Sequence, residues 1–298
     1  MTSAPETVVA LPAKPRRARS AGRTRTPAIV TAGIYLGLLV GAAVTLGPFL
    51  LSAMTAFKTP EQFAREDPLA LPDPWSLTNM VSLITGPADF GRAIGVTLLM
   101  AVFVTVFQVS FSVLAGYAFA RVDFPGREAM FWIYLSTLMV PAVVVVIPLY
   151  LMMVELGLRN TFWGLVLPFT FASPYAIFLL REYFRGIPQD VIDASRLDGA
   201  NTLDTLVEVV VPMSKPIIAT LVLITMVSQW NSFMWPLVVT SGSQWRVITV
   251  ATASLQSQYN GNWTLVMSAT TLALVPLILL FLLFQKQIVR SIAITGFR

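Results

Sequence analysis

The chain of 298 residues contains no cysteine and no histidine, and only 12% of its residues are charged. Without cysteine there is no disulfide and no thiol nucleophile, and without histidine there is no imidazole to exchange protons near neutral pH. A soluble globular domain carries about 25% charged and roughly 45–50% apolar residues. This chain is 56% apolar, with a mean hydropathy of +0.74. A disordered chain is excluded, and an ordinary water-soluble enzyme fits poorly.

Long uncharged runs dominate the sequence. A helix needs about 20 apolar residues to cross a bilayer, because its backbone polar groups must be satisfied internally. Six runs are long enough, and we place the spans near residues 28–55, 95–120, 129–153, 161–180, 217–238 and 264–285. The sequence therefore predicts an all-α polytopic membrane protein with six transmembrane helices.

The positive charges give the orientation. A net charge of +5 can indicate nucleic acid, but here lysines and arginines cluster at the ends of the apolar runs. Fifteen of the 20 lie on one side of the predicted membrane and five on the other, and the positive side faces the cytoplasm. We predict a multi-pass protein of a bacterial plasma or inner membrane. Both termini would be cytoplasmic, with lipid and not nucleic acid as a partner.

Five segments follow from this topology: a basic cytoplasmic tail (1–27), a first transmembrane helix (28–57), an extracytoplasmic loop (58–92), a core of spans two to six (93–285) and a cytoplasmic tail (286–298). The loop is the only long one on the outer side and carries five acidic residues. It is either a solvated loop with a short interfacial helix or a docking surface for an extracytoplasmic partner.

The predicted spans contain no Asp, Glu, Lys, Arg or His. Such side chains usually mark proton relays, ion coupling or voltage sensing inside a membrane, so proton-driven transport and intramembrane hydrolysis fit poorly. Free energy for uphill transport would then enter from outside the bilayer. A sodium-coupled or facilitative secondary carrier is an alternative, although no internal repeat of that class is seen. A membrane scaffold is another, but it leaves the charged loop described below unexplained.

The fifth span carries a polar and aromatic segment at residues 228–235. Gln229, Trp230 and Asn231 are candidates for a substrate pathway, because amides hydrogen-bond sugar hydroxyls and indole faces cover apolar sugar faces. The alternative is a set of interhelical hydrogen bonds next to an interfacial aromatic belt.

The loop at residues 181–215 holds ten of the 35 charged residues. Its pattern predicts two short amphipathic helices, with Pro188 at the first helical position. A turn is predicted at Asp198 and Gly199, because glycine tolerates positive φ. Pro212 and Pro216 are predicted to end the second helix and start the fifth span. The apolar faces are Val191, Ala194 and Ser195 in the first helix, and Leu203, Leu206, Val207 and Val210 in the second. Interfacial membrane helices favour basic polar faces, whereas this loop has six acidic and four basic residues, which favours a protein partner.

This loop resembles the coupling loop of bacterial ABC importer permeases, whose motif is E-A-A-x3-G-x9-I-x-L-P. The matching residues, at the same spacing, are Asp193, Ala194, Ser195, Gly199, Val209, Val211 and Pro212. Further similar segments are GlyTyrAlaPheAlaArg (116–121), PheProGly (124–126), IleProLeuTyr (147–150), PheLeuLeuArg (178–181), AspGlyAla (198–200) and TrpAsn (230–231). The likeness runs from about Trp75 to the C-terminus and is to the second permease subunit of maltose-type sugar importers.

The resemblance implies a type I ABC importer permease fold and a non-catalytic transmembrane subunit. The implied partners are a homologous second permease, two copies of a cytoplasmic ABC ATPase and an extracytoplasmic solute-binding protein. ATP and Mg²⁺ would bind the ATPase, with no cofactor on this chain. The implied substrate is a carbohydrate, an oligosaccharide or related polyol; glycerol phosphate or its diesters are the alternative.

The resemblance also assigns roles within residues 188–212, the loop expected to couple to the ATPase. Asp193 is expected to contact the ATPase, Gly199 to permit the turn, and Ala194 and Ser195 to form the close-packed surface. The full set of expected coupling residues is Asp193, Ala194, Ser195, Asp198, Gly199, Ala200 and Pro212.

Overall fold

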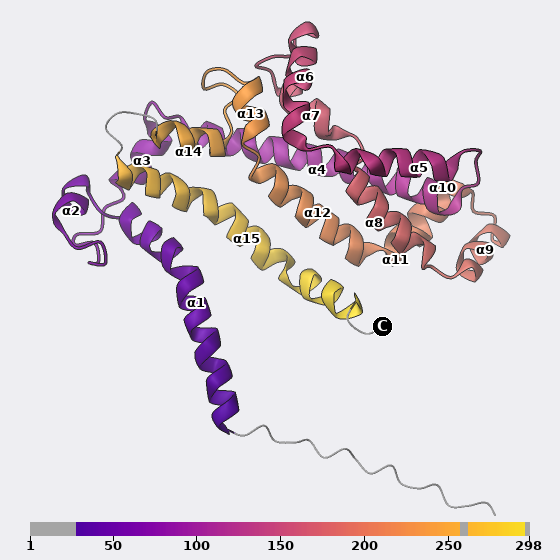
Figure 1. The fold of residues 1–298 in the computed structure, drawn as a ribbon, viewed down its shortest axis with the longest axis horizontal. Coiled ribbons are helices and arrows are strands. Elements are labelled where there is room, and N and C mark those ends of the chain that lie inside the picture. Colours follow the sequence, from indigo (N-terminus) through magenta and orange to yellow (C-terminus); the bar gives the residue numbers. More distant parts are fainter. Residues whose placement is uncertain (1–27, 257–261, 296–298) are drawn as a thin grey trace, which may run out of the picture. The chain divides into compact units, whose positions relative to one another are not determined.

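A computed structural model describes residues 28–256 and 262–295, and all regular structure in these ranges is helical. Four helical segments are long and apolar enough to cross a membrane: Ile29–Ala56, Phe90–Arg121, Phe162–Arg185 and Trp263–Gln285. Two bent helix pairs bring the total to as many as six. The all-α architecture is confirmed, but several predicted spans are interrupted. Figure 1 labels the helices and colours them along the sequence.

The third predicted span, 129–153, is a broken helix. It consists of α5 (Arg127–Ser136), a 3₁₀ turn η1 (Thr137–Met139) and α6 (Ala142–Glu155), and the two arms are bent by 101°. Val140 has an extended conformation immediately before Pro141. A proline disfavours helical geometry in the preceding residue and supplies no amide donor, so the helix ends there.

The fourth predicted span is also interrupted by proline. It comprises α7 (Phe162–Thr170) and α8 (Pro174–Arg185), separated by an extended residue, Ser173, directly before Pro174. The same geometric restriction applies as at Pro141. α8 continues past the predicted boundary at residue 180 and therefore carries Arg181 into the helix.

The fifth predicted span, 217–238, is wrong in its second half. α12 (Lys215–Trp230) ends at Trp230, and a separate short helix, α13 (Met234–Val239), follows. At its start α12 is bent by 81° against the segment 202–213. The sixth span, α15 (Trp263–Thr295), extends past residue 285. The predicted tail at 1–27 and the last three residues lie outside the described residues.

The chain divides into two compact units, Met1–Gly47 and Pro48–Arg298. The described part of the first is the beginning of α1 (Ala28–Ala56), whose apolar side chains are largely exposed, as suits a helix in lipid. In the second unit, Figure 1 shows α2 (Pro60–Arg65) and α3 (Thr78–Thr85) at one end and α9 (Gln189–Leu197) at the opposite end.

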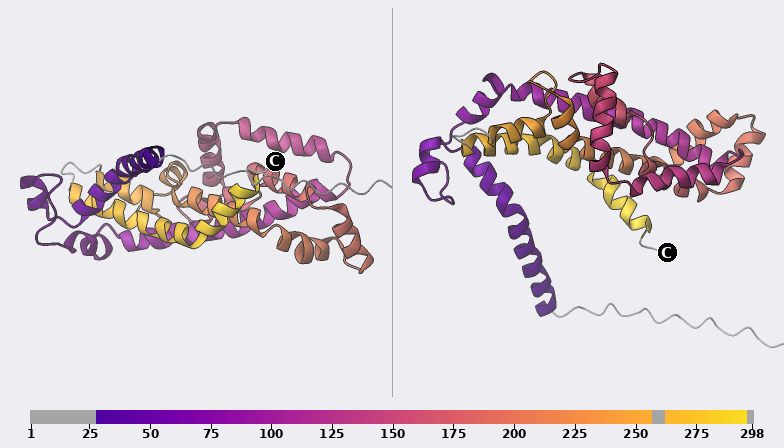
Figure 2. Two further views of the ribbon diagram at one scale, coloured as in Figure 1. Left: turned by 90° about the horizontal axis from the view of Figure 1, so that it is seen from below. Right: turned by 45° about the horizontal axis from the view of Figure 1, so that its top comes forward.

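The central helix of the second unit is α4 (Phe90–Arg121), which packs against α7, α8 and α12 (Figure 2). It contributes to three buried apolar clusters: Val109, Val113 and Tyr117 to the first, Val96, Met100 and Val104 to the second, and Phe90 and Ala93 to the third. α4 and α8 approach closely at Gly116, where an added Cβ would lie 2.8 Å from the Cβ of Leu180. A displacement of α4 therefore disturbs most of the buried core.

Candidate functional site

The predicted turn after α9 is confirmed, and Gly199 is its key residue. Gly199 has a φ of 90°, a region that side-chain-bearing residues rarely adopt. Its N–H donates to the carbonyl of Arg196 at 3.0 Å, and the N–H of Ala200 donates to that of Ser195, also at 3.0 Å. This pair of bonds is the Schellman motif, with the exposed Asp198 as the C-cap residue of α9. The AspGlyAla sequence thus ends one helix and reverses the chain.

The next helical turn is started by Asn201, which sequence reasoning missed. Its side-chain oxygen accepts hydrogen bonds from the N–H groups of Leu203 (2.8 Å) and Asp204 (3.1 Å), and Asp204 accepts one from the N–H of Asn201. This reciprocal arrangement is a capping box, and it begins α10 (Thr202–Asp204). The spacing Asn-x-x-Asp was the available signal.

The two residues of the expected close-packed surface of α9, Ala194 and Ser195, differ in burial. The buried residues of α9 are Ile192 and Ser195, whereas Ala194 is exposed. The hydroxyl of Ser195 donates to the carbonyl of Ile192 (2.7 Å) and lies 3.1 Å from that of Thr205. Ser195 therefore joins the two arms of the loop, while Ala194 lies on the outer face of α9.

The predicted apolar face of the second loop helix is wrong. A π-helical turn, η2 (Thr205–Val210), replaces the expected α-helix. Leu206 and Val210 are buried in the chain, whereas Leu203 and Val207 are each 61% exposed, so the four do not share one face. The wider π-helical register breaks the i, i+3, i+4, i+7 pattern, and two apolar side chains consequently point outward.

The second loop helix ends between Pro212 and Pro216, as predicted. Pro212 lies inside the short helix α11 (Val211–Met213), directly after η2, and the chain bends at Ser214. A proline ring in an α-helix clashes with the carbonyl four residues earlier. Since a π-helical turn shifts the hydrogen-bond register by one residue, η2 accommodates Pro212 without a break.

α9 is attached to the core by Arg121, the last residue of α4. The Arg121 guanidinium donates to the carbonyls of Phe184, Arg185 and Ile187 at the end of α8. It also donates to Gln189 at 2.6 Å, and Gln189 in turn donates to the Asp193 carboxylate at 2.9 Å. The Asp193 side chain is therefore exposed to solvent, and its orientation is fixed by Gln189. Arg121 is a second residue of the site that sequence reasoning missed, and its only signal was the family-like segment 116–121.

The α9–α11 segment, defined here as residues 186–214, exposes apolar side chains between charged ones. Leu197 is 89% exposed, and Leu203 and Val207 are the two outward residues of the second arm. Asp190, Asp193 and Asp198 are exposed around them. A rigid, capped turn with exposed leucines and a charged rim fits insertion into a groove on another protein.

The second candidate group, Gln229, Trp230 and Asn231, does not share one helical face. Trp230 is buried, and its indole N–H donates to the carbonyl of Ala273 at 3.2 Å, which is the interhelical hydrogen bond of the alternative interpretation. Asn231 follows the last residue of α12 and is exposed. Gln229 does not line the pocket described next.

A pocket of about 450 Å³ lies between the end of α12, α14 (Ile248–Gln256) and α15. Its lining residues are uncharged and mix aromatic and polar groups: Trp230, Asn231, Phe233, Ile248, Thr249, Thr252, Ala253, Gln256, Thr270, Ala273, Leu274 and Leu277. The Asn231 amide donates to the carbonyl of Val227 at 2.8 Å, which leaves its side-chain oxygen to accept a hydrogen bond. The arrangement suits a neutral hydroxyl-bearing ligand.

Comparison with family models matches residues 108–294 to the family described as the binding-protein-dependent transport system inner membrane component. The match covers more than half of the chain. The arabinooligosaccharides transport system permease protein of Halalkalibacterium halodurans is 27% identical over 276 residues, or 92% of this chain and 99% of that protein. The sn-glycerol-3-phosphate transport system permease protein of Yersinia pestis is 29% identical over 265 residues, or 87% and 94%.

Among solved structures, a bacterial ABC transporter involved in the import of the acidic polysaccharide alginate has a similar chain. The two agree with a TM-score of 0.78 at 24% identity, over 88% of this chain and 98% of that chain. This likeness confirms the predicted fold class, that of an ABC importer permease.

Proposed function

The chain belongs to the family of inner-membrane components of binding-protein-dependent transport systems, and on that premise we propose that it is a permease subunit of an ATP-driven carbohydrate importer. It forms half of the translocation pathway and hydrolyses no ATP itself. The observation that carries the proposal is the α9–α11 segment, a capped turn on which Leu197, Leu203 and Val207 are mostly exposed. Exposed apolar side chains on a rigid turn suit a docking site for an ATPase.

The proposed complex contains a homologous second permease, two copies of a cytoplasmic ABC ATPase and an extracytoplasmic solute-binding protein. ATP and Mg²⁺ bind the ATPase, and no cofactor binds this chain. The distribution of lysine and arginine supports a topology with both termini and the α9–α11 segment in the cytoplasm. Closure of the ATPases on ATP then biases the permease between two states through contacts made at α9.

Reconstitution tests this function directly. The chain is purified with its associated subunits and placed in proteoliposomes with ATP inside and the loaded solute-binding protein outside. We expect co-purification of an ATPase and a second permease, together with uptake that stops without ATP. Accumulation of a solute against its gradient by this chain alone, without ATP, contradicts the proposal.

For the substrate, we propose a neutral oligosaccharide or related polyol that contacts the pocket beside Asn231. The uncharged polar lining supports this class, since a phosphate ester favours arginine or lysine ligands. The two relatives named above carry arabinooligosaccharides and sn-glycerol 3-phosphate, so both classes are compared. Arabinooligosaccharide is expected to compete with the transported substrate for the solute-binding protein, and sn-glycerol 3-phosphate is not.

Two neighbouring amides provide a matched pair for the pocket. Asn231→Ala is expected to lower uptake about 5-fold, because one polar contact with the substrate is lost. Gln229→Ala is the control, since Gln229 does not line the pocket. Equal uptake by the two variants removes Asn231 from the substrate pathway without affecting the proposed coupling to the ATPase.

A further inference from the structure

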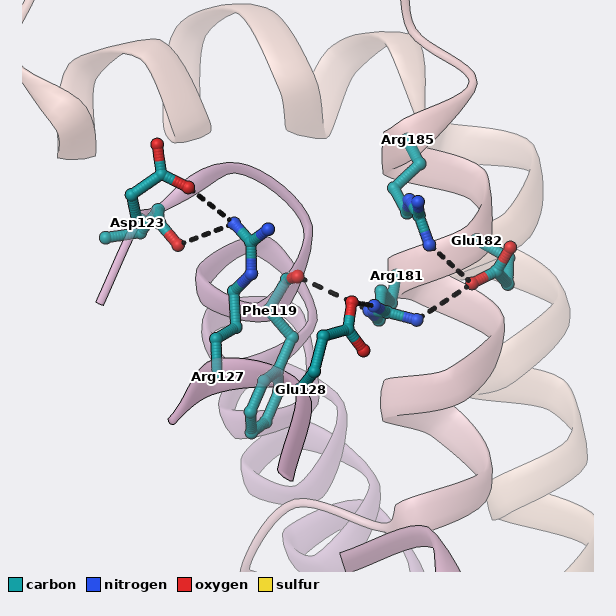
Figure 3. A network of polar contacts seen from close by, with 8 residues as sticks. Phe119, Asp123, Arg127, Glu128, Arg181, Glu182 and Arg185 are labelled. Atoms are coloured by element: carbon teal, nitrogen blue, oxygen red, sulfur yellow. Dashed lines mark hydrogen bonds and ion pairs between the residues drawn. The ribbon is translucent and has the colours of Figure 1, made fainter. Parts of the chain in front are cut away.

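A single arginine connects three helices at the base of the α9–α11 segment (Figure 3). Arg181 in α8 is only 4% exposed. Its guanidinium pairs with Glu128 of α5, donates to the carbonyl of Phe119 in α4 at 3.3 Å, and pairs with Glu182 at 3.2 Å. It also lies 4.0 Å from the centre of the Phe131 ring of α5. A guanidinium with its planar fork of donors is well suited to hold several elements at once.

Buried apolar side chains lie next to Arg181, in addition to its two carboxylate partners. Leu180 and Phe184, its neighbours in α8, are completely buried, and Phe131 is nearly so. Burying an ion pair in such a place brings little net stability, because the desolvation cost offsets the attraction. Glu128 is half exposed, so solvent screens part of the attraction. The contact is therefore better explained by the geometry that it fixes than by stability.

That geometry joins two parts of the chain that the proposed mechanism must connect. α8 leads directly into the α9–α11 segment, and Arg121 fixes the junction from the side of α4. α5 leads through the 101° bend into α6, the arm of the broken span. Within the described residues, the Arg181–Glu128 pair is the only ion pair between α5 and α8.

We propose that Arg181 is a positioning residue for coupling: its pair with Glu128 keeps α5 fixed to α8 throughout the transport cycle, so that movement of α9 is passed to α5 and α6. The proposal rests on the function given above, because it assumes that α9 is driven by an ATPase. Arg181 contacts neither substrate nor nucleotide in this role. Its loss separates ATP hydrolysis from uptake without preventing assembly.

The first test replaces single residues in the reconstituted complex. For Arg181→Met, we expect the amount of substrate imported per ATP hydrolysed to fall about 10-fold, as expected for loss of a partly buried charge pair, while the complex still assembles. Glu128→Gln, which keeps a hydrogen-bond acceptor, is expected to cause a smaller fall. The control is Arg127→Met, because Arg127 pairs at 2.8 Å with Asp123 inside the α4–α5 corner and does not reach α8.

The second test uses the absence of cysteine in the chain. In Glu128→Cys/Arg181→Cys, with partner subunits freed of reactive cysteines, the unmodified complex is expected to be uncoupled. Bridging the two thiols with a bifunctional reagent of side-chain length is expected to restore import per ATP to within about 2-fold of wild type. The bridge links α5 to α8 again but does not replace either charge. Restored import therefore indicates that the role of the pair is to position the two helices.

A normal import ratio in Arg181→Met, or a bridged complex that remains uncoupled or is blocked, overturns the proposal. If Arg181→Met does not assemble, the import per ATP hydrolysed is measured for Glu128→Gln and for the bridged double variant. A normal ratio in Glu128→Gln, or a bridged complex without restored import, then overturns the proposal. The wild-type complex is measured in the same liposomes. If it shows no ATP-driven uptake, the proposed function is refuted; if it does, the variants test the role of Arg181 separately.

Discussion

The α9–α11 segment and the α2–α3 segment (residues 57–89) use the same local device at opposite ends of the second unit. Each starts a short helix with a capping box, Asn201 with Asp204 in one and Thr59 with Gln62 in the other. Each also exposes apolar side chains. The two segments differ in the part of the molecule to which they are attached.

The α2–α3 segment is attached to the end of α1, to α15 and to the start of α4. Lys58 is 1% exposed; its ammonium group donates to the carbonyl of Asp67 at 3.0 Å and lies 3.8 Å from the Glu66 carboxylate. Asn79 donates to the carbonyls of Ala56 and Lys58 and accepts from the hydroxyl of Thr264 at 3.3 Å. These contacts hold the segment to the end of α1 and the start of α15.

The α9–α11 segment is attached instead to α4 and α8 by Arg121. Since α4 contributes to all three buried clusters, a force on α9 reaches the centre of the helix bundle. The α2–α3 segment contacts α4 at its first turns, where Leu83 packs in the third cluster with Phe90 and Ala93. We therefore expect anchoring through Arg121, and not local helix capping, to distinguish the segment proposed to couple to the ATPase from the α2–α3 segment.

The largest effect is expected from removing Arg121, the residue that attaches the α9–α11 segment to α4 and α8. Arg121→Met leaves the carbonyls of Phe184, Arg185 and Ile187 without their donor, and we expect a loss of about 3 kcal/mol in the free energy of unfolding. Uptake should fall at least about 10-fold, because α9 loses its fixed position. The measurements are the thermal midpoint of the purified complex and the initial uptake rate; unchanged values of both refute the anchoring role.

The corresponding change in the α2–α3 segment is Lys58→Met. It removes the buried ammonium group that holds Asp67, and the expected cost is about 2 kcal/mol. Proteolysis within residues 57–89 should become faster, whereas import per ATP hydrolysed should stay at the wild-type value. Arg65→Met is the control, since Arg65 is exposed on the same segment. A fall in import per ATP for Lys58→Met removes the contrast between the segments.

Gly199 tests the turn itself. Its φ of 90° costs a branched residue about 1–2 kcal/mol, while an added Cβ meets no atom of the chain within 4 Å. Gly199→Val is therefore expected to lower uptake strongly, and Gly199→Asn only slightly, because asparagine tolerates left-handed backbone. Uptake of the two variants is compared at equal amounts of assembled complex. Equal losses would mean that bulk at the docking surface, and not backbone strain, is responsible.

Much of this architecture is predictable from the sequence, for physical reasons that also explain the failures. Long apolar runs give the helices, and AspGlyAla gives the turn, because both depend on short-range chemistry. The π-helical turn before Pro212 is not predictable, since periodicity assumes one helical register, so the pattern assigns Leu203 and Val207 to the wrong face. The burial of Ser195 depends on Thr205, ten residues away, and a sequence pattern does not contain that contact.

The smallest expected effect comes from the capping boxes, which the two segments share. Asn201→Ala and Thr59→Ala each remove the side-chain acceptor of a capping box, and each is expected to cost about 1 kcal/mol. Because the local cost is the same, a difference in transport reports on the role of the segment. Asn201→Ala should lower import per ATP measurably, since a frayed α10 loosens the arm that holds Leu203 and Val207 outward. Thr59→Ala should leave the ratio unchanged. If the two variants have the same ratio, the capped turn after α9 has no special part in coupling, and the contrast rests on Arg121 alone.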